Sequence, residues 1–139
     1  MKTPEAFLKT HAAALGFDAC AIAPANKAWP ASAHLDDFVA AGRHGDQHWM
    51  ETTHARRKTP TAMWAEAKSA VVVAMSYGPD HDPMDTLEEH SSGNISVYAR
   101  GADYHDLLKK RLKALARDFV AETSAAVKVF VDTAPLMEK

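Results

Sequence analysis

Residues 69–77 read Ser-Ala-Val-Val-Val-Ala-Met-Ser-Tyr, and this stretch decides the fold class. Its apolar run is continuous rather than alternating, which is typical of a strand buried on both faces of a sheet. Gly78 and Pro79 follow at once and end the run. We therefore predict a central strand at 69–77 that is covered by helices.

Upstream of this strand, the sequence predicts a helix, a short strand and a second helix. Thr3 offers an N-cap hydroxyl and Pro4 stands at the first helical position, so a helix begins there, and Gly16 is placed to end it. Residues 18–23 form the short strand, and 32–41 form the second helix. Together with the strand at 69–77, these elements favour an α/β arrangement.

Residues 43–60 are polar, rich in His and Arg, and weakly patterned. We expect a long loop here with one short helix at 48–52. A loop of this length within a compact domain is often functional. The eight histidines are spread along the chain, and we predict no metal site from them.

Downstream, an acidic loop at 80–93 leads to a short extended piece at 95–98. A strong helix then runs over 103–122, because Asp103 is a good N-cap and apolar residues recur at helical spacing. Its apolar stripe consists of Leu108, Leu112, Leu115 and Phe119. Residues 127–132, Val-Lys-Val-Phe-Val-Asp, alternate and predict a last strand.

These elements predict one α/β domain over residues 1–139, a mixed sheet covered by helices. The chain stops soon after its last predicted strand. We therefore expect the sequence to be truncated.

Composition favours a soluble, cytoplasmic protein. We also expect a monomer, although the sequence carries no signal for the oligomeric state. Hydrophobic residues make up 47% of the chain, charged residues 24%, and the formal net charge is −2. No targeting segment or membrane-spanning run stands out. A charge this mild gives no obvious face for RNA. Cys20 is the one cysteine, so the chain holds no internal disulfide and cannot ligate an iron–sulfur cluster by itself.

Asp132 is the first candidate for chemistry, because it stands where the last predicted strand ends. Ligands of helix-covered sheets tend to bind at the carboxyl ends of strands. Partial burial there would favour the neutral acid, which can donate a proton near neutral pH. The alternative is that Asp132 caps the turn that begins at Thr133.

Residues 98–105, Tyr-Ala-Arg-Gly-Ala-Asp-Tyr-His, are the densest polar and aromatic cluster. They lead into the amino end of a helix, where backbone N–H groups favour anions and amide oxygens. Arg100 has the fork geometry for a carboxylate or a phosphate. His105 is either a ligand-binding residue or an ordinary core or capping histidine.

Two further groups have a functional and an ordinary interpretation. Residues 56–58, Arg-Arg-Lys, form a basic patch that suits a phosphate, or else a solvated loop. Trp29, Trp49 and Trp64 would either line a pocket for a large planar ligand or belong to the core. We find no glycine-rich phosphate loop.

Several strings together resemble the epoxyqueuosine reductase family. They are GRHGDQHWM (42–50), RKTP (57–60), AKSAVVVAMSY (67–77), SVYARGADYHDLLKKRL (96–112) and VKVFVDTAPLMEK (127–139). The string Tyr-Ala-Arg-Gly-Ala-Asp-Tyr-His followed about thirty residues later by Val-Asp-Thr-Ala-Pro is the specific part.

The resemblance implies an oxidoreductase of queuosine biosynthesis. Such an enzyme reduces the epoxide of epoxyqueuosine in tRNA to queuosine with cobalamin, and two 4Fe–4S clusters in a ferredoxin-like domain supply the electrons. This chain would be the amino-terminal, cobalamin-binding domain, without that ferredoxin-like domain, and inactive alone. The family's catalytic acid falls on Asp132. Its cobalamin contacts fall on Arg57, Ser96, Asp132, Tyr98 and His105.

Two other functions stay open at this point. The chain is alternatively a non-catalytic module that binds a cofactor or RNA, or part of a related cobalamin-dependent reductase that acts on a small molecule. The sequence does not identify the electron donor.

Overall fold

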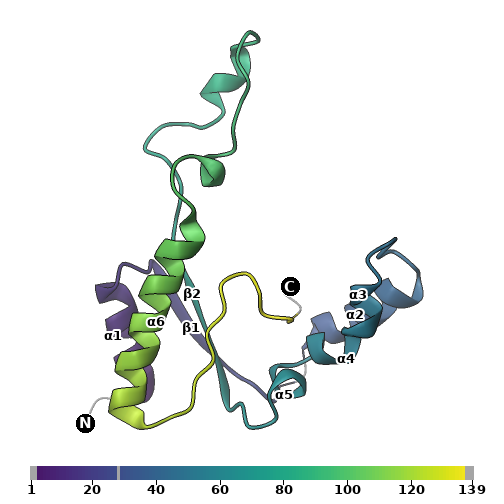
Figure 1. Ribbon diagram of the computed structural model, residues 1–139, viewed down its shortest axis with the longest axis vertical. Coiled ribbons are helices and arrows are strands. Elements are labelled where there is room, and N and C mark those ends of the chain that lie inside the picture. Colours follow the sequence, from purple (N-terminus) through teal and green to yellow (C-terminus); the bar gives the residue numbers. More distant parts are fainter. Residues whose placement is uncertain (1–2, 28, 137–139) are drawn as a thin grey trace. The chain divides into compact units, whose positions relative to one another are not determined.

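The computed structural model describes residues 3–27 and 29–136 (Figure 1). The regular elements, in chain order, are helix α1 (Pro4–Ala14), strand β1 (Ala19–Pro24), helices α2 (Pro30–Ala40), α3 (Trp49–Thr52), α4 (His54–Arg57) and α5 (Pro60–Met63), strand β2 (Ser69–Ala74), the 3₁₀ turns η1 (Asp85–Glu88) and η2 (Val97–Ala99), and helix α6 (Tyr104–Thr123). Helices and strands are both present, which confirms the α/β class.

The chain divides into two compact units. The first unit comprises Met1–Cys20 and Val73–Val131, and the second comprises Ala21–Val72 and Asp132–Lys139. Within the described residues, none of the helices combines the length and the apolar character that crossing a bilayer requires.

Helix α1 begins and ends where the sequence predicts. The Thr3 hydroxyl accepts a hydrogen bond from the Ala6 N–H at 3.2 Å, and Pro4 is the first helical residue. Gly16 follows the helix with φ +81°, a conformation that suits glycine. A Cβ at Gly16 would lie 2.6 Å from Nη1 of Arg111, which donates to the Gly16 carbonyl. The turn after α1 is therefore tied to α6.

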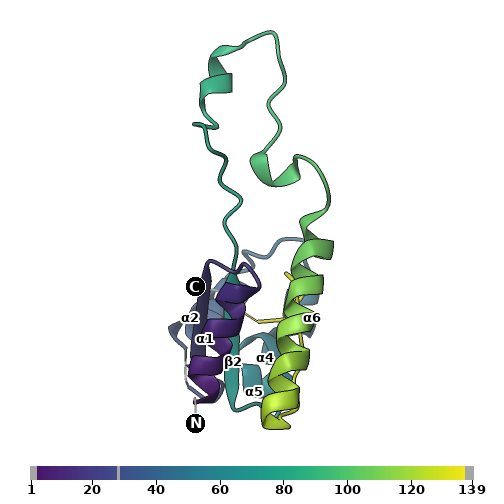
Figure 2. The same cartoon turned by 90° about the vertical axis from the view of Figure 1, so that its left-hand side faces the viewer.

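Helices α1 and α6 lie side by side and form the core of the first unit (Figure 1 and Figure 2). The predicted apolar stripe of α6 faces this core: Leu115 is only 3% exposed, and the Phe119 ring lies 6.2 Å from that of Phe7. On the other side, Leu8 and Ala12 of α1 are buried. The packing confirms the predicted face of α6.

The two strands pair in an antiparallel sheet. The Asp18 N–H donates to the Ala74 carbonyl at 2.9 Å, and the Ala25 N–H donates to the Lys68 carbonyl at 3.0 Å, so the strands run in opposite directions. The prediction of a mixed sheet is wrong for the described residues, which form this two-stranded sheet alone. The α/β class is represented here by helices together with this small antiparallel sheet.

The expected burial of β2 on both faces is also wrong. Strand β2 ends at Ala74 instead of residue 77, and the Val72 side chain is 60% exposed. A continuous apolar run predicts a covered strand only when other layers are present to cover it. In the part of the chain that the structure describes, no further strand extends the sheet.

Residues 127–132 do not form the predicted strand. They are irregular, and Val127, Val129 and Phe130 are exposed. A strand needs a neighbour for its backbone hydrogen bonds, and the described residues provide none for this segment. Residues 97–99 likewise form the 3₁₀ turn η2 in place of the expected extended piece.

The second unit is organised around α2. Leu35 of α2 is fully buried, and the Ser32 hydroxyl donates to the Lys58 carbonyl at 2.6 Å. The Lys58 ammonium lies 2.7 Å from Asp36, and its hydrogen bond holds the pKa of the Asp36 carboxyl below its ordinary value. The segment 43–60 thus contains two short helices, α3 and α4, and is fastened to α2. Helix α3 confirms the short helix predicted at 48–52, whereas α4 lies where loop was predicted.

The amino end of α6 is capped by Asp103, as predicted. Its carboxylate accepts a hydrogen bond from the His105 N–H at 2.9 Å, and its Oδ1 lies 2.8 Å from His105 Nδ1. The backbone N–H first, and the imidazole second, hold the pKa of Asp103 below its ordinary value. The ionised carboxylate therefore stabilises the start of α6.

This cap predicts an acid-sensitive contribution to stability. Because the folded-state pKa of Asp103 is lowered, its contribution is present above the unfolded pKa and is lost as the pH falls through the folded value. Asp103→Asn keeps a capping side chain but no longer titrates. We expect the stability difference between the parent chain and this variant to shrink on acidification, which thermal unfolding at pH values from about 7 to about 3 would measure. A difference that stays constant with pH would contradict the prediction.

Candidate functional site

The five residues that the sequence singled out for cofactor and catalysis fall in both units. Ser96, Tyr98 and His105 belong to the first unit, on the segment that leads into α6. Arg57 and Asp132 belong to the second unit. Each group is described within its own unit.

The segment before α6 carries a row of aromatic rings. The Tyr98 ring packs edge-on against Tyr104, with centroids 6.4 Å apart and planes at 80°, and Tyr104 stacks on His105 at 4.2 Å. The Tyr98 side chain is 55% exposed, and Ser96 is exposed as well. The arrangement presents aromatic faces and hydrogen-bonding groups beside the amino end of a helix, which suits a large polar ligand.

Arg100 is held by its own loop. Its Nε donates to the Ile95 carbonyl at 2.9 Å, and its Nη2 donates to Asn94 Oδ1 at 3.2 Å. An open hollow in the first unit is lined by Thr86, Glu89, Ser92, Gly93, Asn94, Ile95 and Arg100. Arg100 therefore orders residues 94–100 in this structure, and its role toward a carboxylate or phosphate stays a prediction.

Arg57 lies in α4 and is held against Trp49. Its guanidinium carbon lies 4.3 Å from the centroid of the Trp49 ring, and its Nε donates to the Thr53 hydroxyl at 2.8 Å. The Trp49 indole N–H in turn donates to Gln47. Since Lys58 pairs with Asp36, two of the three residues in the predicted basic patch already have partners within the protein.

Asp132 is exposed and has φ +53°, in the left-handed region. Aspartate tolerates this conformation better than most residues. It lies at a bend that follows irregular chain, not at the end of a strand, so the turn interpretation matches the local backbone. Its role as a proton donor stays a prediction.

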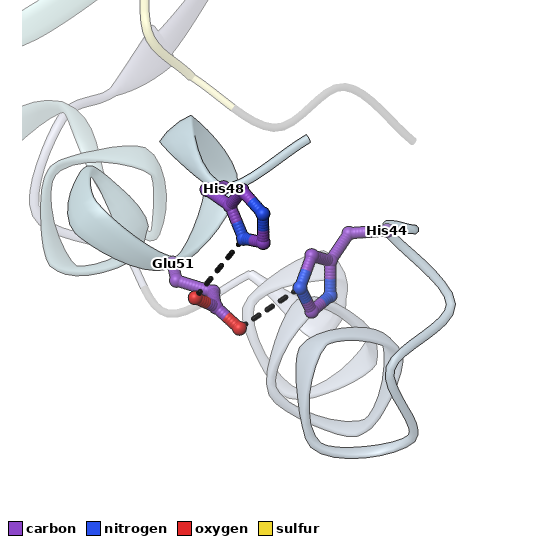
Figure 3. Close-up of side chains that lie close together, drawn as sticks. All are labelled: His44, His48 and Glu51. Atoms are coloured by element: carbon purple, nitrogen blue, oxygen red, sulfur yellow. Dashed lines mark ion pairs between the residues drawn. The ribbon is translucent and has the colours of Figure 1, made fainter. Parts of the chain in front are cut away.

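A cluster of His44, His48 and Glu51 was not among the predicted site residues. His44 Nε2 lies 2.9 Å from one Glu51 oxygen, and His48 Nδ1 lies 3.9 Å from the other (Figure 3). The sequence carries a signal for it, because His44 and His48 are four residues apart with Glu51 three residues later. This His-x-x-x-His spacing lies within a segment whose weak pattern predicts mostly loop, so it does not by itself indicate a shared helix face.

Comparison with known families decides the relationship. The model of a family described as epoxyqueuosine reductase QueG, DUF1730, matches residues 57–133, which is more than half of the chain. The chain belongs to the epoxyqueuosine reductase family. All five predicted site residues fall inside the matched range, whereas the cluster of His44, His48 and Glu51 lies before it.

Curated epoxyqueuosine reductases align with nearly all of the chain. The one from Xanthomonas campestris pv. campestris is 34% identical over 95% of the chain, that from Gloeobacter violaceus is 35% identical over 100%, and that from Cellulophaga algicola is 31% identical over 95%. The chain spans only 38% to 42% of the length of these epoxyqueuosine reductases. No solved structure matches it.

Proposed function

We propose that this chain is the cobalamin- and substrate-side domain of a cytoplasmic epoxyqueuosine reductase, which reduces the epoxide of epoxyqueuosine to queuosine in tRNA. The observation that carries the proposal is the family match over residues 57–133, which includes every residue expected to contact cofactor or substrate. The alignment of curated epoxyqueuosine reductases with nearly the whole chain supports it further.

The residues of the first unit fit one edge of a cobalamin. Ser96, Tyr98 and His105 place a hydroxyl, a phenol and an imidazole on one segment beside a helix amino end, and all three are exposed. Such groups suit the amide-rich periphery of a corrin ring. When bound, cobalamin would supply the reducing equivalents, and we propose that 4Fe–4S clusters outside this chain deliver them.

Arg57 is a further residue that we propose contacts cobalamin. Its stacking on Trp49 and its bond to Thr53 fix the plane of the guanidinium. A guanidinium whose plane is fixed loses less conformational freedom on binding than a mobile one. We propose that it binds an amide oxygen or the phosphate of the cofactor.

Asp132 would act as the proton donor. As the C–O bond of the epoxide opens, its oxygen would leave as an alkoxide unless it is protonated, and a carboxylic acid within hydrogen-bond distance can supply that proton. Asp132 is exposed in this structure, so we propose that bound cofactor and substrate exclude water from it in the complete reductase.

The test is an assay on tRNA that carries epoxyqueuosine. We expect the longer protein that contains this chain, loaded with cobalamin and supplied with a reductant, to form queuosine, detected by mass spectrometry of digested nucleosides. The 139-residue chain alone should form none. Queuosine formation by the chain alone would contradict the proposed division of labour. Failure of the longer protein, combined with reduction of a small molecule, would contradict the proposed substrate.

A further inference from the structure

We propose that His44, His48 and Glu51 form a binding site for a divalent transition metal of the zinc class. Two imidazoles and one carboxylate are a donor set that zinc accepts. The proposal depends only on these side chains and is independent of the proposed reductase activity.

The donor atoms lie near the separation that a metal requires. One atom from each residue lies within 4.8 Å of the other two. Zinc bonds nitrogen and oxygen at about 2.0–2.2 Å, so the donors of a tetrahedral site stand roughly 3.3–3.6 Å apart. His44 Nε2 lies 2.9 Å from one oxygen of Glu51 and His48 Nδ1 lies 3.9 Å from the other, so these two distances lie on either side of that value. Small rotations of exposed side chains would complete the geometry.

The local fold explains why the three residues meet. His48 is the N-cap of α3 and Glu51 lies in its first turn, and residues three apart share one side of a helix. The chain between α2 and α3 turns back through Gly42 and Gly45, which have φ +66° and +53°. This turn brings His44 beside Glu51, as Figure 3 shows. The site therefore joins the turn to α3.

Burial gives the three ligands different roles. The His44 side chain is 7% exposed and is held in place, whereas those of His48 and Glu51 are 76% and 51% exposed. A metal held by three protein ligands at an open surface keeps a position for water. The buried His44 imidazole has a fixed position beside Glu51. The exposed His48 side chain can rotate toward a metal ion bound by the other two residues.

The hydrogen-bond partners of the proposed ligands limit the affinity of the site for Zn²⁺. A metal-binding histidine usually donates its second ring N–H to a partner, and His44 Nδ1 is buried without one among the described residues. Missing partners of this kind typically weaken metal binding by about 10- to 100-fold. We therefore expect a dissociation constant for Zn²⁺ that is roughly micromolar, weaker than in a closed structural site.

Isothermal titration of the metal-free 139-residue chain with Zn²⁺ tests the site. We expect one ion per chain. His48→Ala and Glu51→Gln change exposed side chains, so they should fold, and each should weaken binding by roughly 10-fold or more. His34→Ala, at an exposed histidine of α2, is the matched control and should bind as the parent does.

A second readout is the visible spectrum with Co²⁺, which distinguishes a defined coordination site from scattered association. We expect the absorption of a nitrogen- and oxygen-ligated Co²⁺ that Zn²⁺ displaces and that Mg²⁺, which prefers oxygen ligands, does not. The proposal is overturned if the parent chain binds no Zn²⁺ at millimolar concentration. It is equally overturned if the His34→Ala chain loses as much affinity for Zn²⁺ as the two cluster variants. Equal losses would mean that Zn²⁺ does not bind specifically at the cluster, whose three residues would then form ion pairs only.

Discussion

Asp132→Asn in the longer reductase is expected to lower kcat for epoxyqueuosine reduction by about 100- to 10,000-fold, the usual contribution of a positioned acid. The amide keeps the size of the side chain but cannot supply an acidic proton to the leaving oxygen. Asparagine also tolerates the φ of +53° at this position, so the bend should persist. Alanine would be a poorer test because it disfavours that backbone conformation.

The measurement is single-turnover formation of queuosine, accompanied by titration with cobalamin followed in the visible spectrum. Cobalamin affinity should change little, since the amide retains hydrogen-bonding groups. Asp80→Asn makes the same chemical change at an exposed aspartate of the loop after β2 and serves as the control. Full turnover by the Asp132→Asn enzyme would refute the role of Asp132 as proton donor.

The helix ends could be predicted because short-range chemistry sets them. The Thr3 hydroxyl, the proline after it and the left-handed Gly16 bound α1, and the Asp103 carboxylate starts α6. Each of these signals acts within about four residues, so the local sequence contains all that is needed. The buried side of α6 could be predicted as well, because the helical spacing of its apolar residues identifies the side that packs on α1.

The sheet could not be predicted in the same way. The burial of Val72 and the strand at 127–132 both depend on which segments pair, and pairing joins residues far apart in the sequence. The apolar pattern indicates that these residues favour burial, but it does not indicate which segment of the protein would cover them. In the described residues they remain exposed. Their exposure is the main difference between the predicted and the observed fold.

For the candidate site, too, the sequence predicts which residues are involved but not how they are arranged in space. The residues alone indicate Asp132, the cluster at 98–105 and the basic patch at 56–58. The resemblance adds Ser96 and the roles toward cobalamin, but neither source gives distances. The aromatic row around Tyr98 and the stacking of Arg57 on Trp49 emerge only from the structure. The cluster of His44, His48 and Glu51 had a spacing signal, but its geometry depends on a glycine-rich turn whose path periodicity does not describe.

Leu115→Ala in the 139-residue chain is expected to lower the free energy of unfolding by about 2–5 kcal/mol, the usual cost of removing a buried leucine. Leu115 lies on α6 and is 3% exposed, in the unit where α6 packs against α1. Truncation would leave a cavity between the two helices, because a packed core relaxes only partly around lost atoms.

Leu107→Ala supplies the matched control, since it makes the same substitution on the same helix at a side chain that is 45% exposed. Both variants remove the same atoms and gain the same helix propensity, so the difference between them isolates burial. We expect Leu107→Ala to change the unfolding free energy by less than about 1 kcal/mol. Urea unfolding followed by circular dichroism at the helix band measures both, because α6 is the longest helix described, at 20 residues. Equal losses for the two variants would show that α6 does not bury the side of Leu115 in solution, and the packing of α1 on α6 would have to be revised.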